Sequence, residues 1–466
     1  MGEWSPKIVA FLCTWCSYAG ADLAGTSRNQ YPPNIRVIRV PCSGRINPLY
    51  IIKALLEGAD GVMVSGCHPG DCHYLVGNFY ARRRFIVLKK LLTVAGFEAN
   101  RVHFTWVSAS EGVRFANVIK VVTDKVSALG PNPVGTQGDG KQGKQGDRFS
   151  AFALSKAENL SPCFPSVEAV NPTFEEQQER LFPLCKKLLE DGTVDRIIGF
   201  KEGEKTGISI PCFIDSPAES GKLVWNNRCV PNLSGYLREL TGKDKGKTAI
   251  VAKPCDARAI DNLIVENQIK RDDVFIIGLV CGGMMGDNGQ LLPGCADCRV
   301  KTPPVYDVLI GEPGVDEGDR VAIEQGTSDE SFERFLGEMQ KCILCYSCRQ
   351  ACYGCYCETC FMERGEPDWQ TVSPDMGAKM LYHLGRATHL SGRCVECGAC
   401  ENACASGVNI RYLIREVTRF IEDTYDYQTG MNLDDEPVML TYDFDDLEIG
   451  FLHSPDSVGA GGDSDA

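Results

Sequence analysis

The chain has 466 residues, 43% of them hydrophobic and 24 of them cysteine, and its 48 basic and 62 acidic side chains give a net charge of −14. This hydrophobic content excludes a wholly disordered chain, the acidic balance argues against nucleic acid as a partner, and we find no run of about 18 apolar residues that could form a transmembrane segment. Because no basic segment followed by an apolar one opens the chain, we expect a cytoplasmic protein whose clustered cysteines hold metal or carry out redox chemistry.

Residues 1–129 are predicted to form an α/β domain. Short runs rich in β-branched and aromatic residues alternate there with longer stretches of helical pattern. The predicted strands are residues 7–12, 35–40, 61–64 and 102–107, and the clearest helices are residues 48–56 and 80–95. Strands that alternate with helices favour a doubly wound parallel sheet.

Five cysteines of this domain are candidate metal ligands, and most of them directly follow predicted strands. They are Cys13, Cys16, Cys42, Cys67 and Cys72. The carboxyl ends of parallel strands meet at one edge of a sheet, so thiols far apart in the sequence would gather there. Four of the five would close a [2Fe–2S] or [4Fe–4S] site, and the residues do not decide which four. The alternative is that these are scattered buried cysteines.

Residues 130–147 are rich in Gly, Gln and Pro, and we interpret them as a flexible linker that isolates the first domain. The second domain is predicted to span residues 148–330. After a helix that ends near residue 190, residues 247–252, 256–268 and 274–280 have the pattern of a strand, a helix and a second strand. This is a compact βαβ unit in a second α/β domain.

Four cysteines of the middle domain form a second candidate site. Cys255 ends one strand of the βαβ unit, Cys281 ends the next, and Cys295 and Cys298 follow in a loop. Adjacent parallel strands would bring Cys255 and Cys281 to the same edge, where the Cys-x-x-Cys pair could complete four thiolates. We interpret the set as a [4Fe–4S] site, with structural zinc as the alternative.

The third domain, residues 331–420, carries the strongest motif in the chain. Its two cysteine runs, with identical spacing, are Cys342, Cys345, Cys348 and Cys352, and Cys394, Cys397, Cys400 and Cys404. This spacing is typical of dicluster ferredoxins, in which the fourth cysteine of each run binds the other [4Fe–4S] cluster. The alternative is a pair of zinc sites. Three more thiols, Cys355, Cys357 and Cys360, are either packing residues, part of a further cluster or a redox pair.

Residues 421–466 are acidic. After Arg419 the chain has 13 Asp and Glu and no Lys or Arg. We expect a solvated tail, although the acidic and aromatic segment around Tyr442 could dock on a partner.

The first domain resembles the delta-subunit family of methyl-viologen-reducing hydrogenases. The residues that carry the resemblance are CTWCSYAGAD at 13–22, PCSG at 41–44 and GCHPGDCHY at 66–74. The resemblance implies a [2Fe–2S] carrier that passes electrons to a heterodisulfide-reductase-A-like flavoprotein, which is the usual site of electron bifurcation.

The middle domain is similar to the beta-subunit superfamily of deazaflavin-coenzyme-reducing hydrogenases and formate dehydrogenases. The matching segments are IGF at 198–200, LVWN at 223–226, KPCDARA at 253–259 and QIKR at 268–271. Typical members bind a flavin and carry their ferredoxin module on the N-terminal side. Here the module follows the domain, so FAD is a weaker expectation than the clusters.

Together these patterns predict an iron–sulfur electron-transfer subunit with one [2Fe–2S] and three [4Fe–4S] clusters. It would link an oxidoreductase module to a heterodisulfide-reductase-A-like flavoprotein in an anaerobic complex with other redox subunits. We expect no substrate site of its own, because the clusters do the redox work. The alternatives are a subunit whose middle domain holds FAD and exchanges hydride with a coenzyme, and a zinc-stabilised scaffold.

Overall fold

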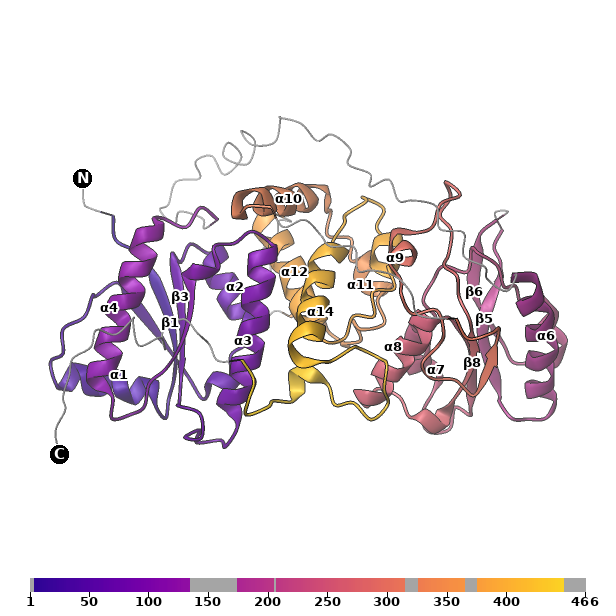
Figure 1. The fold of residues 1–466 in the computed structure, drawn as a ribbon, viewed down its shortest axis with the longest axis horizontal. Coiled ribbons are helices and arrows are strands. Elements are labelled where there is room, and N and C mark those ends of the chain that lie inside the picture. The colour runs from indigo at the N-terminus through magenta and orange to yellow at the C-terminus, as the bar shows by residue number, and fades with distance from the viewer. Residues whose placement is uncertain (1–3, 135–173, 205–206, 315–325, 365–374, 448–466) are drawn as a thin grey trace.

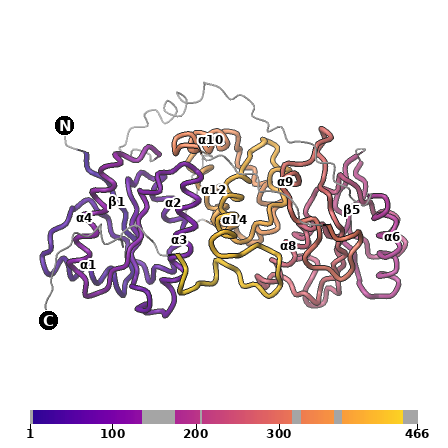
Figure 2. Tube along the Cα trace, in the orientation of Figure 1, coloured from indigo at the N-terminus to yellow at the C-terminus, as the bar shows by residue number. Residues whose placement is uncertain are grey.

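The computed structural model describes residues 4–134, 174–204, 207–314, 326–364 and 375–447. Two α/β parts stand at opposite ends, and a helical part that carries both ferredoxin-type runs lies between them (Figures 1 and 2). Most of the predicted linker, from residue 135 onward, lies outside the described residues.

The first α/β part contains a four-stranded sheet in which every pair of neighbouring strands is parallel. Its strands are β1 (Ile8–Cys13), β2 (Ile35–Val40), β3 (Gly61–Gly66) and β4 (Val102–Trp106), in the order β2-β1-β3-β4. The helices α1 (Ser17–Thr26) and α4 (Gly112–Leu129) cover one face, and α2 (Pro48–Leu56) and α3 (Gly77–Val94) cover the other. The predicted doubly wound parallel sheet is confirmed.

Local sequence explains where these elements begin and how deeply they lie. The central strand β3 is buried along its whole length, as its apolar run GVMVSG predicts. The edge strand β2 instead alternates Arg with Val and Ile and is largely exposed. The helix α2 begins at a cap, because the Asn47 side chain accepts a hydrogen bond from the Leu49 amide at 3.0 Å and Pro48 occupies the first turn.

The second α/β part contains a five-stranded mixed sheet. Its strands are β5 (Arg196–Glu202), β6 (Ser209–Ile214), β7 (Thr248–Ala252), β8 (Val274–Leu279) and β9 (Val308–Ile310), in the order β6-β5-β7-β8-β9. Only β6 runs antiparallel to its neighbour among these strands. The helix α8 (Pro254–Val265) connects the parallel strands β7 and β8, which confirms the predicted βαβ unit. The helix α6 (Phe174–Glu190) packs near β9.

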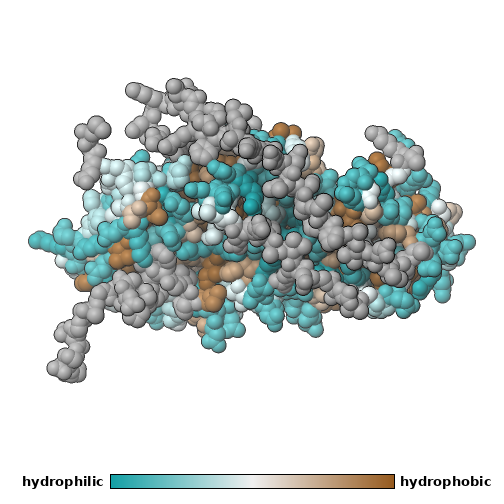
Figure 3. Space-filling model, turned by 45° about the horizontal axis from the view of Figure 1, so that its top comes forward, coloured by the Kyte–Doolittle hydropathy of each residue, from teal (hydrophilic) through white to brown (hydrophobic). Residues whose placement is uncertain are grey.

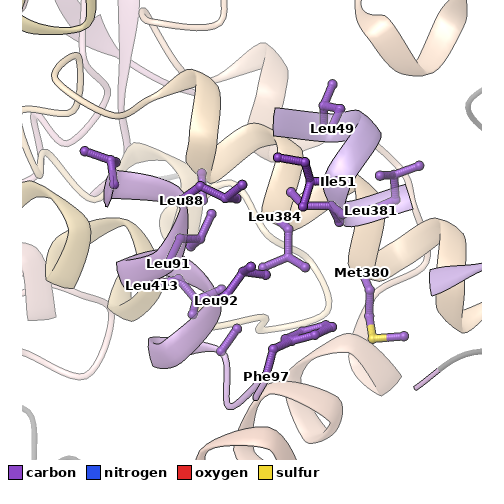
Figure 4. Packing of buried hydrophobic residues seen from close by; sticks show 14 of the residues in the cluster. Leu49, Ile51, Leu88, Leu91, Leu92, Phe97, Met380, Leu381, Leu384 and Leu413 are labelled. Carbon is purple, nitrogen blue, oxygen red and sulfur yellow. The ribbon is translucent and has the colours of Figure 1, made fainter. Parts of the chain in front are cut away.

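The helical part shares one hydrophobic core with the first sheet. It contains α10 (Ser328–Lys341), α12 (Met376–His389), α14 (Arg411–Tyr425) and the short helices α11 (Ser347–Gln350) and α13 (Ala399–Asn402). In Figure 4, Leu88 and Leu92 of α3 face Leu384 of α12 and Leu413 of α14. The expectation that a linker isolates the first domain is therefore wrong in one respect, because this domain is bound to the helical part by direct packing.

Residues 426–447 also differ from the expected solvated tail. Tyr442 stacks on Phe79 of α3 with ring centroids 5.2 Å apart, and Arg83 pairs with buried Asp446. At the other end of the segment, the Arg258 guanidinium of α8 donates to the Thr429 carbonyl at 2.9 Å. The segment thus contacts both α/β parts. Residues 448–466 of the predicted tail lie outside the described residues.

On the face shown in Figure 3 the described residues are mostly hydrophilic, with hydrophobic residues in small separate patches. None of the described helices is both long and apolar enough to cross a bilayer.

Candidate metal centres

The five cysteines of the first domain gather at the carboxyl edge of its sheet. Cys13 ends β1, Cys16 precedes α1, Cys42 follows β2, and Cys67 and Cys72 follow β3. All five are buried, with exposed fractions between 1% and 7%. The topology therefore places them where the order of strands and helices predicts.

The five thiols divide into a group of three and a pair. Cys13, Cys16 and Cys67 have their Sγ atoms within 4.8 Å of one another, and Cys13 and Cys67 are 3.9 Å apart. The Sγ atoms of Cys42 and Cys72 are 4.0 Å apart and stand outside that group. Sulfur ligands of one tetrahedral metal lie about 3.8 Å apart when the metal–sulfur bond is about 2.3 Å. Each subset thus fits one metal ion, and the two subsets together fit a binuclear centre better than a single zinc.

The hydrogen bonds within the group favour a thiolate at its centre. Contacts from the thiols of Cys16, Cys42 and Cys67 lower the pKa of Cys13. The Gly44 amide donates to the Cys42 Sγ at 3.4 Å. Thiolates are the form that binds iron, so the pocket is suited to this ligand chemistry.

Two glycines hold the loops of this site together. A Cβ added at Gly77 would stand 2.6 Å from the Cys42 Sγ, and one added at Gly44 would stand 2.4 Å from the Gly77 carbonyl oxygen. Gly44 lies in a motif that the sequence singles out, whereas Gly77 was missed because nothing in the sequence relates it to Cys42. Only glycine at both positions allows the two loops to approach so closely.

Aromatic and apolar side chains surround the outer rim of the site. Trp15 stacks on His73 with centroids 3.8 Å apart, and its Nε1 donates to the Tyr74 hydroxyl at 3.3 Å. Trp15, Tyr74 and Leu75 are 48%, 50% and 79% exposed. His68 pairs with Glu111 at 2.7 Å. The two histidines of this loop are thus engaged by other side chains.

The four cysteines of the middle domain also lie near one another. Burial raises the pKa of Cys281 to about 12, and Cys295 and Cys298 act in the same direction. Burial and Asp256 raise the pKa of Cys255 well above its ordinary value, and Cys397 and Cys281 add to the effect. No three of these four described thiols lie within 4.8 Å of one another. This spacing is wider than a tetrahedral zinc site requires and leaves room for a larger cluster.

The first ferredoxin-type run opens on a cavity that the second run completes. Cys342, Cys345 and Cys348 line this cavity together with Cys404, and apolar residues such as Ile343 and Val408 enclose them. A thiol of the second run therefore faces the three thiols of the first. The cavity and its donors fit a [4Fe–4S] cluster whose fourth ligand crosses over from the other run.

The three remaining thiols of the second run lie near the fourth thiol of the first run. Burial raises the pKa of Cys397 to about 12, and the next largest cause is the neighbouring Cys352. Burial also raises the pKa of Cys400 to about 11, and Cys352 acts in the same direction. Both sets of neighbours therefore follow the crossed pattern.

The three extra thiols after the first run do not form a group of their own. Cys355 hydrogen-bonds to Cys352 and lowers its pKa to about 6, while Arg386 Nε donates to the Cys355 Sγ at 3.4 Å. Cys357 is exposed. Among the described residues Cys355, Cys357 and Cys360 are not within 4.8 Å of one another, so their geometry does not favour a further cluster.

The second run and the middle-domain site lie side by side. Val395, Tyr353 and Cys397 pack into the core of the second α/β part, close to Cys281 and Cys295. The backbones also approach, since a Cβ at Gly294 would stand 3.4 Å from Gly398 Cα.

Comparison with known proteins matches residues 8–130 to the family described as methyl-viologen-reducing hydrogenase, delta subunit. The chain is 56% identical over 129 residues to the D-type iron-sulfur subunit of the vhc F420-non-reducing hydrogenase of Methanococcus voltae, and the match covers 28% of this chain and 90% of the relative. It is 54% identical over 129 residues to the D-type iron-sulfur subunit of the F420-non-reducing hydrogenase of Archaeoglobus profundus, where the match covers 28% and 94%.

A larger relative contains a similar segment. The chain is 52% identical over 126 residues to the A-type subunit of the ferredoxin:CoB-CoM heterodisulfide reductase of Methanosarcina mazei, and the match covers 27% of this chain and 16% of that protein. The same kind of domain thus occurs in a small separate subunit and as part of a long chain.

Proposed function

This chain belongs, through residues 8–130, to the methyl-viologen-reducing hydrogenase delta-subunit family, and from this premise we propose that it is an iron–sulfur electron-transfer subunit. The observation that carries the proposal is the division of five buried thiols into a group of three and a pair, with sulfur atoms 3.9 Å and 4.0 Å apart. Cys42 and Cys72 would hold one iron of a [2Fe–2S] cluster, and two of Cys13, Cys16 and Cys67 would hold the other.

The remaining sites extend this centre into a path for electrons. Cys342, Cys345, Cys348 and Cys404 would hold one [4Fe–4S] cluster, and Cys394, Cys397, Cys400 and Cys352 a second. Cys255, Cys281, Cys295 and Cys298 would hold a third. Because the helical part lies between the two α/β parts, its clusters would connect the centres at either end (Figure 1). The clusters supply the one-electron chemistry, and the protein sets their positions and potentials.

The names of the relatives indicate the kind of complex. Two are iron–sulfur subunits of hydrogenases, and one is the A-type subunit of a heterodisulfide reductase. We infer that this chain links an oxidoreductase module to a heterodisulfide-reductase-A-like flavoprotein. The exposed Trp15, Tyr74 and Leu75 beside the first site offer that partner a surface close to the cluster.

The flavin alternative has less support in the middle domain. Lys253, in the motif that suggests it, is buried, pairs with Asp256 at 2.8 Å and donates to the Pro231 carbonyl at 2.9 Å. These internal contacts direct its ammonium group into the fold rather than toward a phosphate of FAD.

A reductive titration of the anaerobically purified full chain tests the proposal. Four clusters that each accept one electron should take up about four electrons per chain, with EPR signals from both cluster types. A colourless protein with bound zinc and no electron uptake would contradict it. Uptake of two further electrons by a flavin released on denaturation would favour the FAD alternative.

A further inference from the structure

The segment between the two ferredoxin-type runs contains a helix aimed at one cluster site. The 41 residues between Cys352 and Cys394 include α12, which packs against α2 and α3 on one side and forms part of the shared core. An insertion that only linked the two runs would have no reason to place polar side chains near their sulfur atoms.

Two successive residues of α12 contact ligands of the same proposed cluster. The Tyr382 hydroxyl lies 3.3 Å from the Cys348 Sγ, and the His383 Nε2 lies 3.3 Å from the Cys342 Sγ. Both side chains are buried, with exposed fractions of 1% and 2%, and both line the cavity that these cysteines share.

The direction of both hydrogen bonds follows from the chemistry of a bound cluster. A cysteine that ligates iron is a thiolate and has no proton to donate, so the hydroxyl and the ring nitrogen must donate to sulfur. Burial lowers the pKa of His383 to about 3, and its Nδ1 has no partner among the described residues. The neutral ring therefore carries its single proton on Nε2.

The other cluster site has a different environment. The backbone donors of the two runs match, because the Leu344 amide donates to Cys342 and the Glu396 amide donates to Cys394, each at 3.4 Å. The side chains differ. Tyr353, which lies beside the second set, donates its hydroxyl to the Arg393 carbonyl rather than to sulfur. From α12, the side chain that approaches this region is Arg386, which donates to Cys355.

We propose that Tyr382 and His383 are positioning residues that raise the reduction potential of the cluster held by Cys342, Cys345, Cys348 and Cys404. Reduction adds negative charge to the cluster and its sulfur ligands, and a hydrogen bond to sulfur stabilises that charge more in the reduced state than in the oxidised state. The inference rests on the proposed function, because it requires that this site hold a cluster.

The test is an EPR-monitored redox titration of the full chain carrying Tyr382→Phe, which removes only the hydroxyl. We expect the reduction equilibrium of this cluster to become about tenfold less favourable, a fall of about 59 mV for one electron. The cluster is identified as the one whose signal is changed or lost in Cys345→Ala, and the potentials of the other clusters should stay unchanged.

Tyr412→Phe is the matched control. Its hydroxyl is also buried but has no partner among the described residues, so its removal should leave all potentials unchanged. His383→Gln keeps a donor and His383→Phe removes it, so only the second should lower the potential, while His389→Phe on the same helix should not.

The outcomes separate this inference from the proposed function. A chain without iron at this site would refute the function itself. An intact cluster with an unchanged potential in Tyr382→Phe, or an equal shift in Tyr412→Phe, would overturn the role of α12. If His383→Phe loses the cluster, the Tyr382→Phe titration still decides the matter.

Discussion

Arg83 and Asp446, 363 positions apart in the sequence, form a buried two-point ion pair, with the Arg83 nitrogens 2.6 Å and 2.8 Å from the two carboxylate oxygens. The same guanidinium donates to the Val438 carbonyl and the Thr441 hydroxyl. Arg83 thus fixes residues 438–446 on α3, close to the loops that carry the first cysteine site. The segment is a structural part of the domain, although its composition resembles that of a tail.

Asp446→Ala should destabilise the chain by about 3–5 kcal/mol, because it leaves the Arg83 charge buried without a partner. Anaerobic thermal denaturation followed by circular dichroism should show a lower midpoint. Asp434→Asn, at an exposed carboxylate of the same segment, should change the midpoint little. Equal midpoints for the two variants would show that the ion pair does not hold the segment.

Cys67→Ser should abolish the [2Fe–2S] signal, because Cys67 lies 3.9 Å from Cys13 in the subset that would hold one iron. The ferredoxin-type clusters should remain, since a serine fills nearly the same volume and leaves the shared core intact. Cys16→Ser is the matched variant, and we expect it to retain the signal because Cys13 and Cys67 already form a pair. EPR of the reduced proteins provides the comparison, and loss of every cluster in Cys67→Ser would contradict this local role.

Gly77→Ala should also remove the [2Fe–2S] cluster, although it changes no ligand. The new Cβ would stand 2.6 Å from the Cys42 Sγ and displace it from its position beside Cys72. Gly25→Ala is the control, because nothing lies within 4 Å of its Cβ position in α1. Iron per chain and the intensity of the EPR signal should fall only in the first variant. A Gly77→Ala chain with full signal would show that the loops can separate without loss of the site.

Cys404→Ala should damage the cluster of the Cys342 run and spare that of the Cys394 run. The reason is the cavity in which Cys404 faces Cys342, Cys345 and Cys348. Conversion of one cluster from four irons to three, or its loss, should appear in EPR and Mössbauer spectra. Damage to the Cys394 cluster instead would refute the crossing.

Much of the fold was predictable from local pattern, because buried parallel strands are short apolar runs bounded by turn residues. The position of the first site followed from the same logic, since its cysteines end strands that lie side by side. The contacts that join the parts were not predictable. Gly77 and Cys42, Arg83 and Asp446, and Tyr382 and Cys348 are distant in sequence, and no local period relates them. The segment around Tyr442 was misjudged because its charge suggests solvation, whereas its aromatic ring stacks on Phe79.

The iron content of the anaerobically purified full chain tests the central claim most directly. One two-iron and three four-iron clusters predict about 14 iron atoms per chain and no stoichiometric zinc. A value near 8 iron atoms with stoichiometric zinc would contradict the account, because about 8 irons are what the two ferredoxin-type clusters alone would hold, and the other cysteine sites would then be structural.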